Sequence, residues 1–280
     1  MGYIDRLTYS LKFLKICFQF FNKNRGLMIL PLMSLVTLAF ILMATYEGAS
    51  PLIVSGGVAR FVAAHQHGIA FLIASLLGLY FILSYLYLFF NAALVFCVMY
   101  RMKGRPCSVS RGLILALKKS GHLFLWTLIS STVLLLINRL EQMNDKIAHF
   151  LSLIFGFSWS MSASFVLPIM ISENIGPISA FKEAIRLIGQ GWRKLLSVNF
   201  IFFLILVGIL GVGKLIALFY PQFFATLPIL PILIGLFLIN FIIIQTIHII
   251  YSCGLYLDIK GEEIQGISQS LIHTLVSRPH

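Results

Sequence analysis

Charged residues are scarce in this chain, and acidic residues are the scarcest. Asp and Glu together number nine in 280 residues, against 21 Lys and Arg, and the four types make up 11% of the sequence. A soluble domain carries about 25% charged residues, so this chain has too little polar surface to coat a water-soluble globule. With 59% hydrophobic residues, the composition excludes an ordinary soluble fold.

The motifs that most enzymes use are also missing. The sequence has no H-E-x-x-H, Walker or dinucleotide fingerprint, and its histidines are scattered singly. Glu141 and Asp145 flank a short connection, where Arg139 and Lys146 are adequate solvated partners. No paired carboxylates, activated nucleophile or metal cluster is indicated. We therefore expect neither an enzyme nor a bound cofactor or metal.

The four cysteines form no CxxC pair, which argues against a zinc knuckle or a redox dithiol. Cys17, Cys97, Cys107 and Cys253 lie alone, in or beside apolar segments, and are predicted to be reduced structural thiols. The net charge of +12 raises the alternative of nucleic-acid binding. Lys and Arg of membrane proteins also gather on cytoplasmic segments, where they contact anionic lipid. We favour membrane lipids as partners and expect no nucleic acid.

Long apolar runs are abundant. A helix needs ~18 or more apolar residues to cross about 30 Å of hydrocarbon, and these runs do not alternate as the strands of a β-barrel do. The sequence therefore predicts an all-α, polytopic transmembrane helical bundle. Six spans are expected, at about 27–45, 68–100, 122–137, 147–171, 195–212 and 228–257.

The segments within and between these spans carry further signals. The run 68–100 would measure about 50 Å as one helix, so it must tilt, protrude or break. Residues 46–67 carry Gly and Pro at several positions and are predicted to be a loop. Pro168 is predicted to kink or end the fourth span.

Basic amphipathic helices are predicted next to the spans, on the cytoplasmic surface of the membrane. One covers 1–26, a second follows a capping serine (Ser108 or Ser110), a third covers 177–190, and the cytoplasmic tail, 258–280, carries a short fourth. The predicted apolar sides are Val109, Leu113, Ala116 and Leu117 in the second, and Ile178, Phe181, Ala184, Ile185 and Ile188 in the third. The side chains expected to contact lipid headgroups are Lys12, Lys15, Arg105, Arg111, Lys118, Lys182 and Arg186.

The distribution of basic residues predicts the orientation. Of the 21 Lys and Arg, 17 lie in the N-terminal segment, in 101–121, in 172–194 and in the tail, and four lie in the segments on the other side. Cytoplasmic segments of membrane proteins carry the excess of positive charge. We therefore expect both termini in the cytoplasm, in the inner membrane of a bacterium.

A few polar residues within or beside the spans are candidates for function. Glu173 ends the Pro-kinked fourth span beside the Gly176–Pro177 turn, where it can pair with Lys182, Arg186 or a neighbouring helix. The others are Asn91, Asn240, Gln245 and His248. They serve either as hydrogen-bonding contacts between helices or as a polar seam. The first alternative suits a structural protein that contacts lipid or a partner, and the second a transporter of small molecules or lipids.

An internal repeat is also suggested. Aligning 108–121 with 176–189 matches Leu113 with Phe181, Ala116 with Ala184, and Leu117 with Ile185. The N-terminal helix and the tail fit the same frame, which suggests a repeated unit of surface helix plus hairpin. The alternative is that any two amphipathic helices can be aligned at some offset.

Two stretches carry a family resemblance. FFNAALV at 89–95 precedes an Arg–x–x–Gly turn at 101–104, and SFVLPIMISENIGPISAFKEAIRLIGQGW covers 164–192. They resemble the bacterial membrane family DUF6159 up to about residue 210, and more distantly the YciC-like and glycerophosphodiesterase-associated membrane domains. Glu183 departs from the family pattern, in which a basic or polar residue is frequent. The resemblance implies the six-span fold and supplies no mechanism.

Overall fold

The described part of the chain is built from helices. The computed structural model describes residues 15–65, 67–143, 146–187, 208, 211 and 229–262, and no strand occurs among them. The all-α prediction is confirmed for these residues. In chain order the elements are a helix over 15–23, η1 (Arg25–Met28), α2 (Ile29–Val54), α3 (Gly57–Ala64), α4 (Gly68–Met102), α5 (Val109–Lys118), α6 (Ser120–Glu141), α7 (Lys146–Ser172), the helix Pro177–Leu187, and α10 (Ile229–Lys260).

Four stretches of helix are long and apolar enough to cross a membrane. They are Arg25–Val54, Gly68–Met102, Ser120–Glu141 and Leu238–Lys260. Ser162–Ser172 and Pro177–Leu187 form a further apolar pair, bent by 120° at the residues between them. The described residues thus contain four or five of the six predicted spans. The span predicted at 195–212 lies outside them apart from residues 208 and 211, as do 1–14 and 263–280 of the predicted terminal helices.

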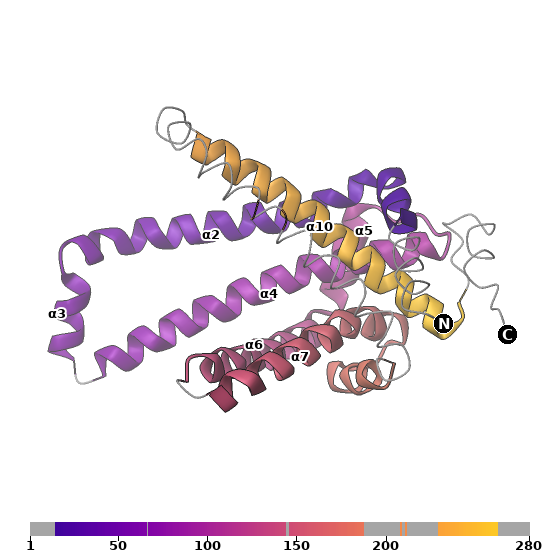
Figure 1. Ribbon diagram of the computed structural model, residues 1–280. Coiled ribbons are helices and arrows are strands. Elements are labelled where there is room, and N and C mark those ends of the chain that lie inside the picture. The colour runs from indigo at the N-terminus through magenta and orange to yellow at the C-terminus, as the bar shows by residue number, and fades with distance from the viewer. Residues whose placement is uncertain are drawn as a thin grey trace.

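The segment between the first two spans is mostly helical, so the prediction of a loop over 46–67 was wrong. α2 continues through Pro51 to Val54, and α3 follows a short turn at Ser55 and Gly56. Gly56 has a φ of 66°, a left-handed conformation that suits a residue without Cβ. One Gly or Pro in a helix costs only about 1–3 kcal/mol, so the apolar helix α2 continues through Gly48 and Pro51. In Figure 1, α2 and α4 are the arms of a long hairpin with α3 at its tip.

α4 is the longest helix, and its surroundings change along its length. Its 35 residues form one helix of about 52 Å, so the predicted long span does not break. The side chains of 69–78 are exposed, whereas every residue from Phe90 to Met99 is buried. Such a run covers all sides of a helix with about 3.6 residues per turn. Protein therefore surrounds this end of α4.

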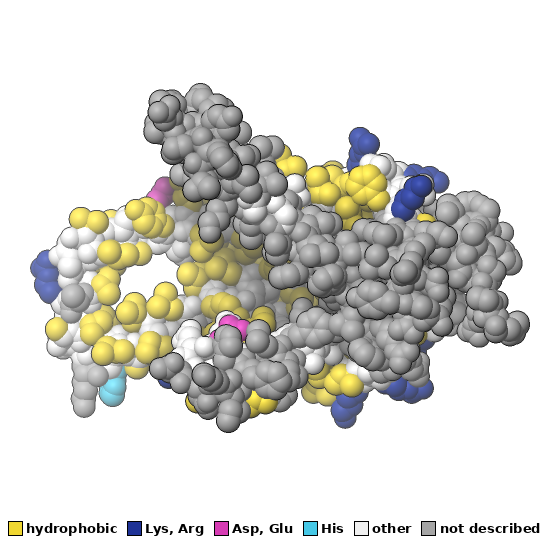
Figure 2. All heavy atoms as spheres, viewed as in Figure 1, with side chains coloured by type: hydrophobic (Ala, Val, Ile, Leu, Met, Phe, Trp, Pro, Cys, Tyr) yellow, Lys and Arg dark blue, Asp and Glu magenta, His cyan; other side chains and the backbone are white. Residues whose placement is uncertain are grey.

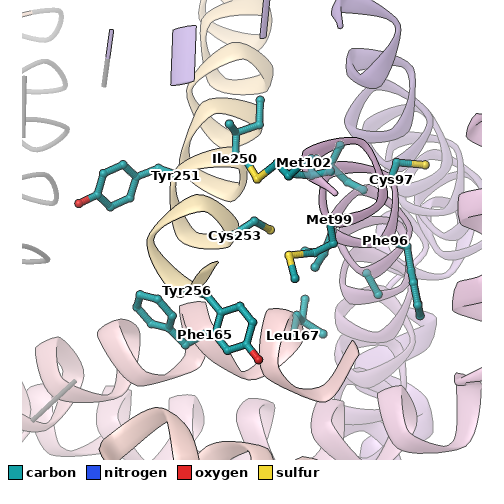
Figure 3. Close-up of a cluster of buried hydrophobic side chains, with 14 of the residues drawn as sticks. Phe96, Cys97, Met99, Met102, Phe165, Leu167, Ile250, Tyr251, Cys253 and Tyr256 are labelled. Carbon is teal, nitrogen blue, oxygen red and sulfur yellow. The ribbon is translucent and has the colours of Figure 1, made fainter. Parts of the chain in front are cut away.

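The hydrophobic core lies around the same end of α4. In Figure 3, Met99 and Met102 of α4 point toward Ile250 and Cys253 of α10. The parts of α2 and α4 that lie toward α3, away from the core, instead expose hydrophobic side chains on the two sides of an opening, and α3 closes its far end (Figure 2). Buried residues of other segments join this core, among them Cys17, Phe20 and Leu27, Ala116 of α5, Leu123 and Trp126 of α6, Phe165 and Met170 of α7, and Ala180, Ala184 and Leu187.

α5 packs closely on α4. The hydroxyl oxygen of Ser108 accepts the N–H of Arg111 at 3.2 Å, so Ser108 is the capping serine. A Cβ added at Gly112 would lie 2.6 Å from Sγ of Cys97 and 2.8 Å from the carbonyl oxygen of Ala93. Only glycine allows this approach.

α6 and α7 form a hairpin beside α4. α6 continues to Glu141, past its predicted end at residue 137. The rings of Trp126 in α6 and Trp159 in α7 stack with centroids 5.6 Å apart, and Phe181 packs on Trp159 at 4.9 Å. α7 passes through Pro168 and ends one turn later at Ser172.

Replacing Gly112 with alanine should weaken the contact between α4 and α5, because the added methyl group overlaps Cys97 and Ala93. We expect Gly112→Ala to lower the stability of the detergent-solubilised protein by about 1–3 kcal/mol. The midpoint of unfolding, followed by tryptophan fluorescence, measures this. Gly121→Ala is the matched control, since a Cβ at Gly121 meets nothing within 4 Å. An equal loss at both glycines would contradict the close packing of α5.

Candidate functional site

Two of the predicted polar residues meet between α4 and α10. The side-chain N–H groups of Gln245 donate to Oδ1 of Asn91 at 2.8 Å and to the hydroxyl of Tyr87 at 3.0 Å. Asn91 is 8% exposed and stands near the start of the buried part of α4. This arrangement joins two helices through their polar side chains, as amides do inside apolar bundles.

The other two polar residues of α10 are placed differently. Asn240 is exposed and lies in the N-terminal half of α10. His248 is half-buried, and its carbonyl oxygen accepts the hydroxyl of Ser252 at 3.0 Å. The polar contact around Gln245 therefore does not extend to Asn240.

Glu173 joins the turn after α7 to the end of α10. Its Oε1 accepts the hydroxyl of Tyr256 at 3.1 Å and pairs with Nζ of Lys260 at 2.8 Å. The same ammonium group pairs with Oε1 of Glu183 at 3.1 Å, and Glu183 also lies 3.7 Å from Arg186. The sequence offered Lys182, Arg186 or a neighbouring helix as the partner of Glu173, and in the structure it pairs with the neighbouring helix α10. The Glu173 and Lys260 side chains are 29% and 32% exposed, so water screens the pair.

Three further polar contacts connect helix ends in this part of the molecule. Arg101 donates to Oδ1 of Asn24 at 2.7 Å, and twice to the carbonyl oxygen of Cys107, at 2.7 and 3.1 Å. Lys103 pairs with Glu262 at 2.6 Å. The third is the hydrogen bond that Lys119 donates to Asn174, a residue with a φ of 57°. Together these contacts tie α4 and α5 to the N-terminal segment, to α10 and to the turn after α7.

Sequence reasoning did not single out Arg101, Tyr256 or Lys260, and it gave Glu183 little weight. The available signal was that each charged residue ends, or closely follows, an apolar run. Partners more than 70 residues apart, such as Glu183 and Lys260, have no spacing that a sequence pattern could show. The pairing therefore emerges only from the fold.

Cys97 and Cys107 are neighbours, contrary to the expectation that the cysteines lie alone. Their sulfur atoms are 2.9 Å apart, and all four cysteines are free and buried. Burial raises the pKa of the Cys17 thiol, which disfavours the thiolate that reacts or binds metal. Among the described residues, no group of three or more His, Cys, Asp or Glu is placed to hold a metal ion.

The first surface helix, α5, and the second, Pro177–Leu187, each bury an alanine and expose a large aliphatic residue next to it. Ala116 and Ala184 are fully buried, whereas Leu117 is 63% exposed and Ile185 is 52% exposed. The predicted apolar sides are therefore divided: their alanines are buried in the protein, whereas Leu117, Ile185 and Ile178, which is 54% exposed, lie on its surface. Small side chains are favoured inside because they let two helix backbones approach closely.

Basic side chains share these outward faces. Arg111 and Lys118 of α5 are exposed, and so are Lys182 and Arg186 of the second surface helix. The guanidinium of Arg111 lies over the ring of Tyr100, 5.6 Å from its centroid. The remaining predicted headgroup contacts are Lys15 and Arg105, which are exposed, and Lys12, which lies outside the described residues.

The long apolar helices of the described residues place the protein in the class of α-helical multi-pass membrane proteins. Within this class, the sequence model of the family of unknown function DUF6159 matches residues 68–262, and the chain belongs to this family. The matched region continues past residue 210, where the resemblance by motifs becomes loose, and includes Asn91, Glu173, Gln245 and Lys260. No curated protein and no solved structure matches the chain.

A double-mutant cycle tests the contact between Asn91 and Gln245. Asn91→Leu removes the acceptor of a partly buried amide, and Gln245→Leu removes the donor, so each change should destabilise the protein. The double variant should lose less stability than the two single variants lose together, with a coupling free energy of about 0.6 kcal/mol, up to about 1.7 kcal/mol. Unfolding in detergent measures the four stabilities, and Asn240→Leu, at an exposed site, serves as the control. Strict additivity would show that the hydrogen bond contributes nothing.

The same approach tests the pair of Glu173 and Lys260. Because both side chains are partly exposed, we expect a coupling of about 0.2–1 kcal/mol between Glu173→Gln and Lys260→Gln. The coupling should shrink in high salt, which screens such pairs. Glu47→Gln removes an exposed carboxylate of α2 and should show no coupling to Lys260→Gln. Equal coupling with Glu47 would mean that the effect reflects overall charge.

Proposed function

We propose that this is a six-span protein of the bacterial inner membrane that holds a basic helical layer against anionic lipid on the cytoplasmic side. The basic layer comprises residues 15–28, 90–119, 173–187 and 246–262. In this proposal the protein has a structural and lipid-contacting role and is not an enzyme. Transport of a small molecule or lipid is the alternative.

Helix lengths support a bilayer next to the basic layer. The part of α4 before its buried run, 68–89, measures about 33 Å, and α6 has 22 residues and a similar length. The two helices lie side by side, since the Tyr85 and Phe124 rings are 6.0 Å apart and the Tyr80 hydroxyl donates to Ser131 O at 3.4 Å. Both lengths suit about 30 Å of hydrocarbon. The rest of α4 then protrudes into the basic layer.

The outward faces of α5 and Pro177–Leu187 carry the proposal. On each, an exposed aliphatic residue is followed directly by an exposed basic one, Leu117 with Lys118 and Ile185 with Arg186. Large aliphatic side chains are unfavourable in water, but at a bilayer surface they enter the headgroup region while Lys and Arg reach the phosphates. An anionic bilayer surface satisfies both kinds of side chain at once.

The charge distribution supports the orientation. The segments assigned to the cytoplasmic side hold 17 of the 21 Lys and Arg, and the positive-inside rule places such segments in the cytoplasm. An even number of spans then keeps both termini on that side. The anionic lipid of the inner leaflet also attracts the basic layer.

The contacts of the polar residues favour the structural role over transport. A transporter site needs polar groups that are available to a substrate at membrane depth. Gln245 instead bonds to Asn91 and Tyr87, and Glu173 bonds to Tyr256 and Lys260. These side chains hold helices together.

Single cysteines test both the membrane contact and the orientation. In a background without the native cysteines, nitroxide labels at Leu117→Cys and Ile185→Cys should be more accessible to oxygen than to an aqueous nickel chelate. Arg105→Cys, exposed just before α5, should react with an impermeant maleimide in inside-out vesicles, and Arg60→Cys, on α3, in right-side-out vesicles. Uniform access of the nickel chelate around Pro177–Leu187 would refute membrane contact. Labelling of Arg105→Cys from the outside would overturn the orientation.

A further inference from the structure

The two surface helices correspond to each other residue by residue. α5 begins at Val109 and the second surface helix at Pro177, an offset of 68 residues, which is the offset suggested by the sequence. Over the ten positions of α5, the degree of burial agrees with that of the partner position at nine. The exception is the first position, where Val109 is half-buried and Pro177 is buried. Two unrelated amphipathic helices need not agree in this way.

The correspondence extends into the helices that precede them. At the same offset, residues 97–102 of α4 align with 165–170 of α7, and most side chains of both stretches are buried in the common core. A residue with positive φ follows each stretch, Gly104 at 73° and Asn174 at 57°. Both units therefore consist of a core helix end, a left-handed turn and a surface helix. This is the signature of an internal repeat.

The outward faces also have the same composition, although the residues are permuted. Each consists of one serine, two large aliphatic and two basic side chains. On α5 these are Ser110, Arg111, Ile114, Leu117 and Lys118, and on the second helix Ile178, Ser179, Lys182, Ile185 and Arg186. The repeat thus preserves the mixture of aliphatic and basic groups while the individual residues differ.

We infer that α5 and Pro177–Leu187 are two separate and equivalent binding sites for anionic phospholipid, one per repeat. This inference rests on the proposed function and adds the number of lipid sites, their location and their equivalence. Positive charge on each face is complementary to a lipid phosphate, and the aliphatic side chains select an amphiphile over a free anion. Glu183 of the second surface helix is half-buried and lies 3.1 Å from Lys260 and 3.7 Å from Arg186. It therefore offsets part of the positive charge of Arg186, while the exposed charges of that face, Lys182 and Arg186, are both basic.

Spin-labelled phosphatidylglycerol in phosphatidylcholine nanodiscs containing the full chain tests the inference. The excess of motionally restricted phosphatidylglycerol over motionally restricted phosphatidylcholine, each spin-labelled in turn, measures the anionic lipid that the protein selects. Arg111→Gln with Lys118→Gln should remove about half of it, as should Lys182→Gln with Arg186→Gln, because each basic residue contributes about fivefold in affinity. The four changes together should remove nearly all of it. Arg60→Gln with Arg139→Gln removes two exposed charges elsewhere and should remove none.

The outcomes separate the inference from the proposed function. If either pair alone abolishes the excess of restricted phosphatidylglycerol, lipid contact stands but the two sites are not independent, and the inference fails. If no variant changes this excess, or the control pair changes it equally, the proposed function fails as well. Water-soluble glycerophosphoglycerol should not compete with the lipid. Full competition would reassign the faces to a soluble phosphate ligand and overturn the inference.

Discussion

A helix longer than the bilayer must place its excess length somewhere, and α4 does so inside protein. Its exposed part is long enough to span hydrocarbon, and its last turns are buried on every side. Burying Phe90–Met99 requires neighbours in every direction around the helix. The N-terminal segment, α5, the end of α7, Pro177–Leu187 and α10 supply them. The arrangement of the basic layer therefore follows from the need to enclose this one stretch.

The polar contacts have a consistent place in that arrangement. Arg101 and Lys103 lie at the end of α4 and Lys119 follows α5, and each connects to a segment distant in sequence. Partly exposed pairs of this kind add little stability individually. Because several connect the same few helix ends, they mainly select one arrangement among alternatives that the apolar packing alone would allow.

Much of the fold could be predicted, because apolar run length is a strong physical signal. Run length predicted the spans near 68–100 and 228–257 but not that each is one continuous helix, which the structure shows. A serine cap was predicted at Ser108 or Ser110, and the structure selects Ser108. The loop over 46–67 was wrong because Gly48 and Pro51 were interpreted as breaks, although an apolar helix tolerates both. The apolar sides of the surface helices could be predicted as stripes, but hydrophobicity alone does not tell that Ala116 and Ala184 face the protein while Leu117 and Ile185 lie on its surface. Glu173 and Gln245 could be selected as candidates, but their partners on other helices could not.

The position of α10 in the chain has a consequence for how the molecule is made. Chains emerge from the ribosome N-terminus first, so α4 is complete well before the residues of α10 that contact it. Until then, Met99 and Met102 lack Ile250 and Cys253, and Asn91 lacks the amide of Gln245. In the incompletely synthesised protein, the apolar end of α4 therefore still lacks its packing partners, and it lies beyond the length of helix that hydrocarbon can cover. Packing of α10 against the end of α4 is therefore a late step of folding, and it completes the hydrophobic core.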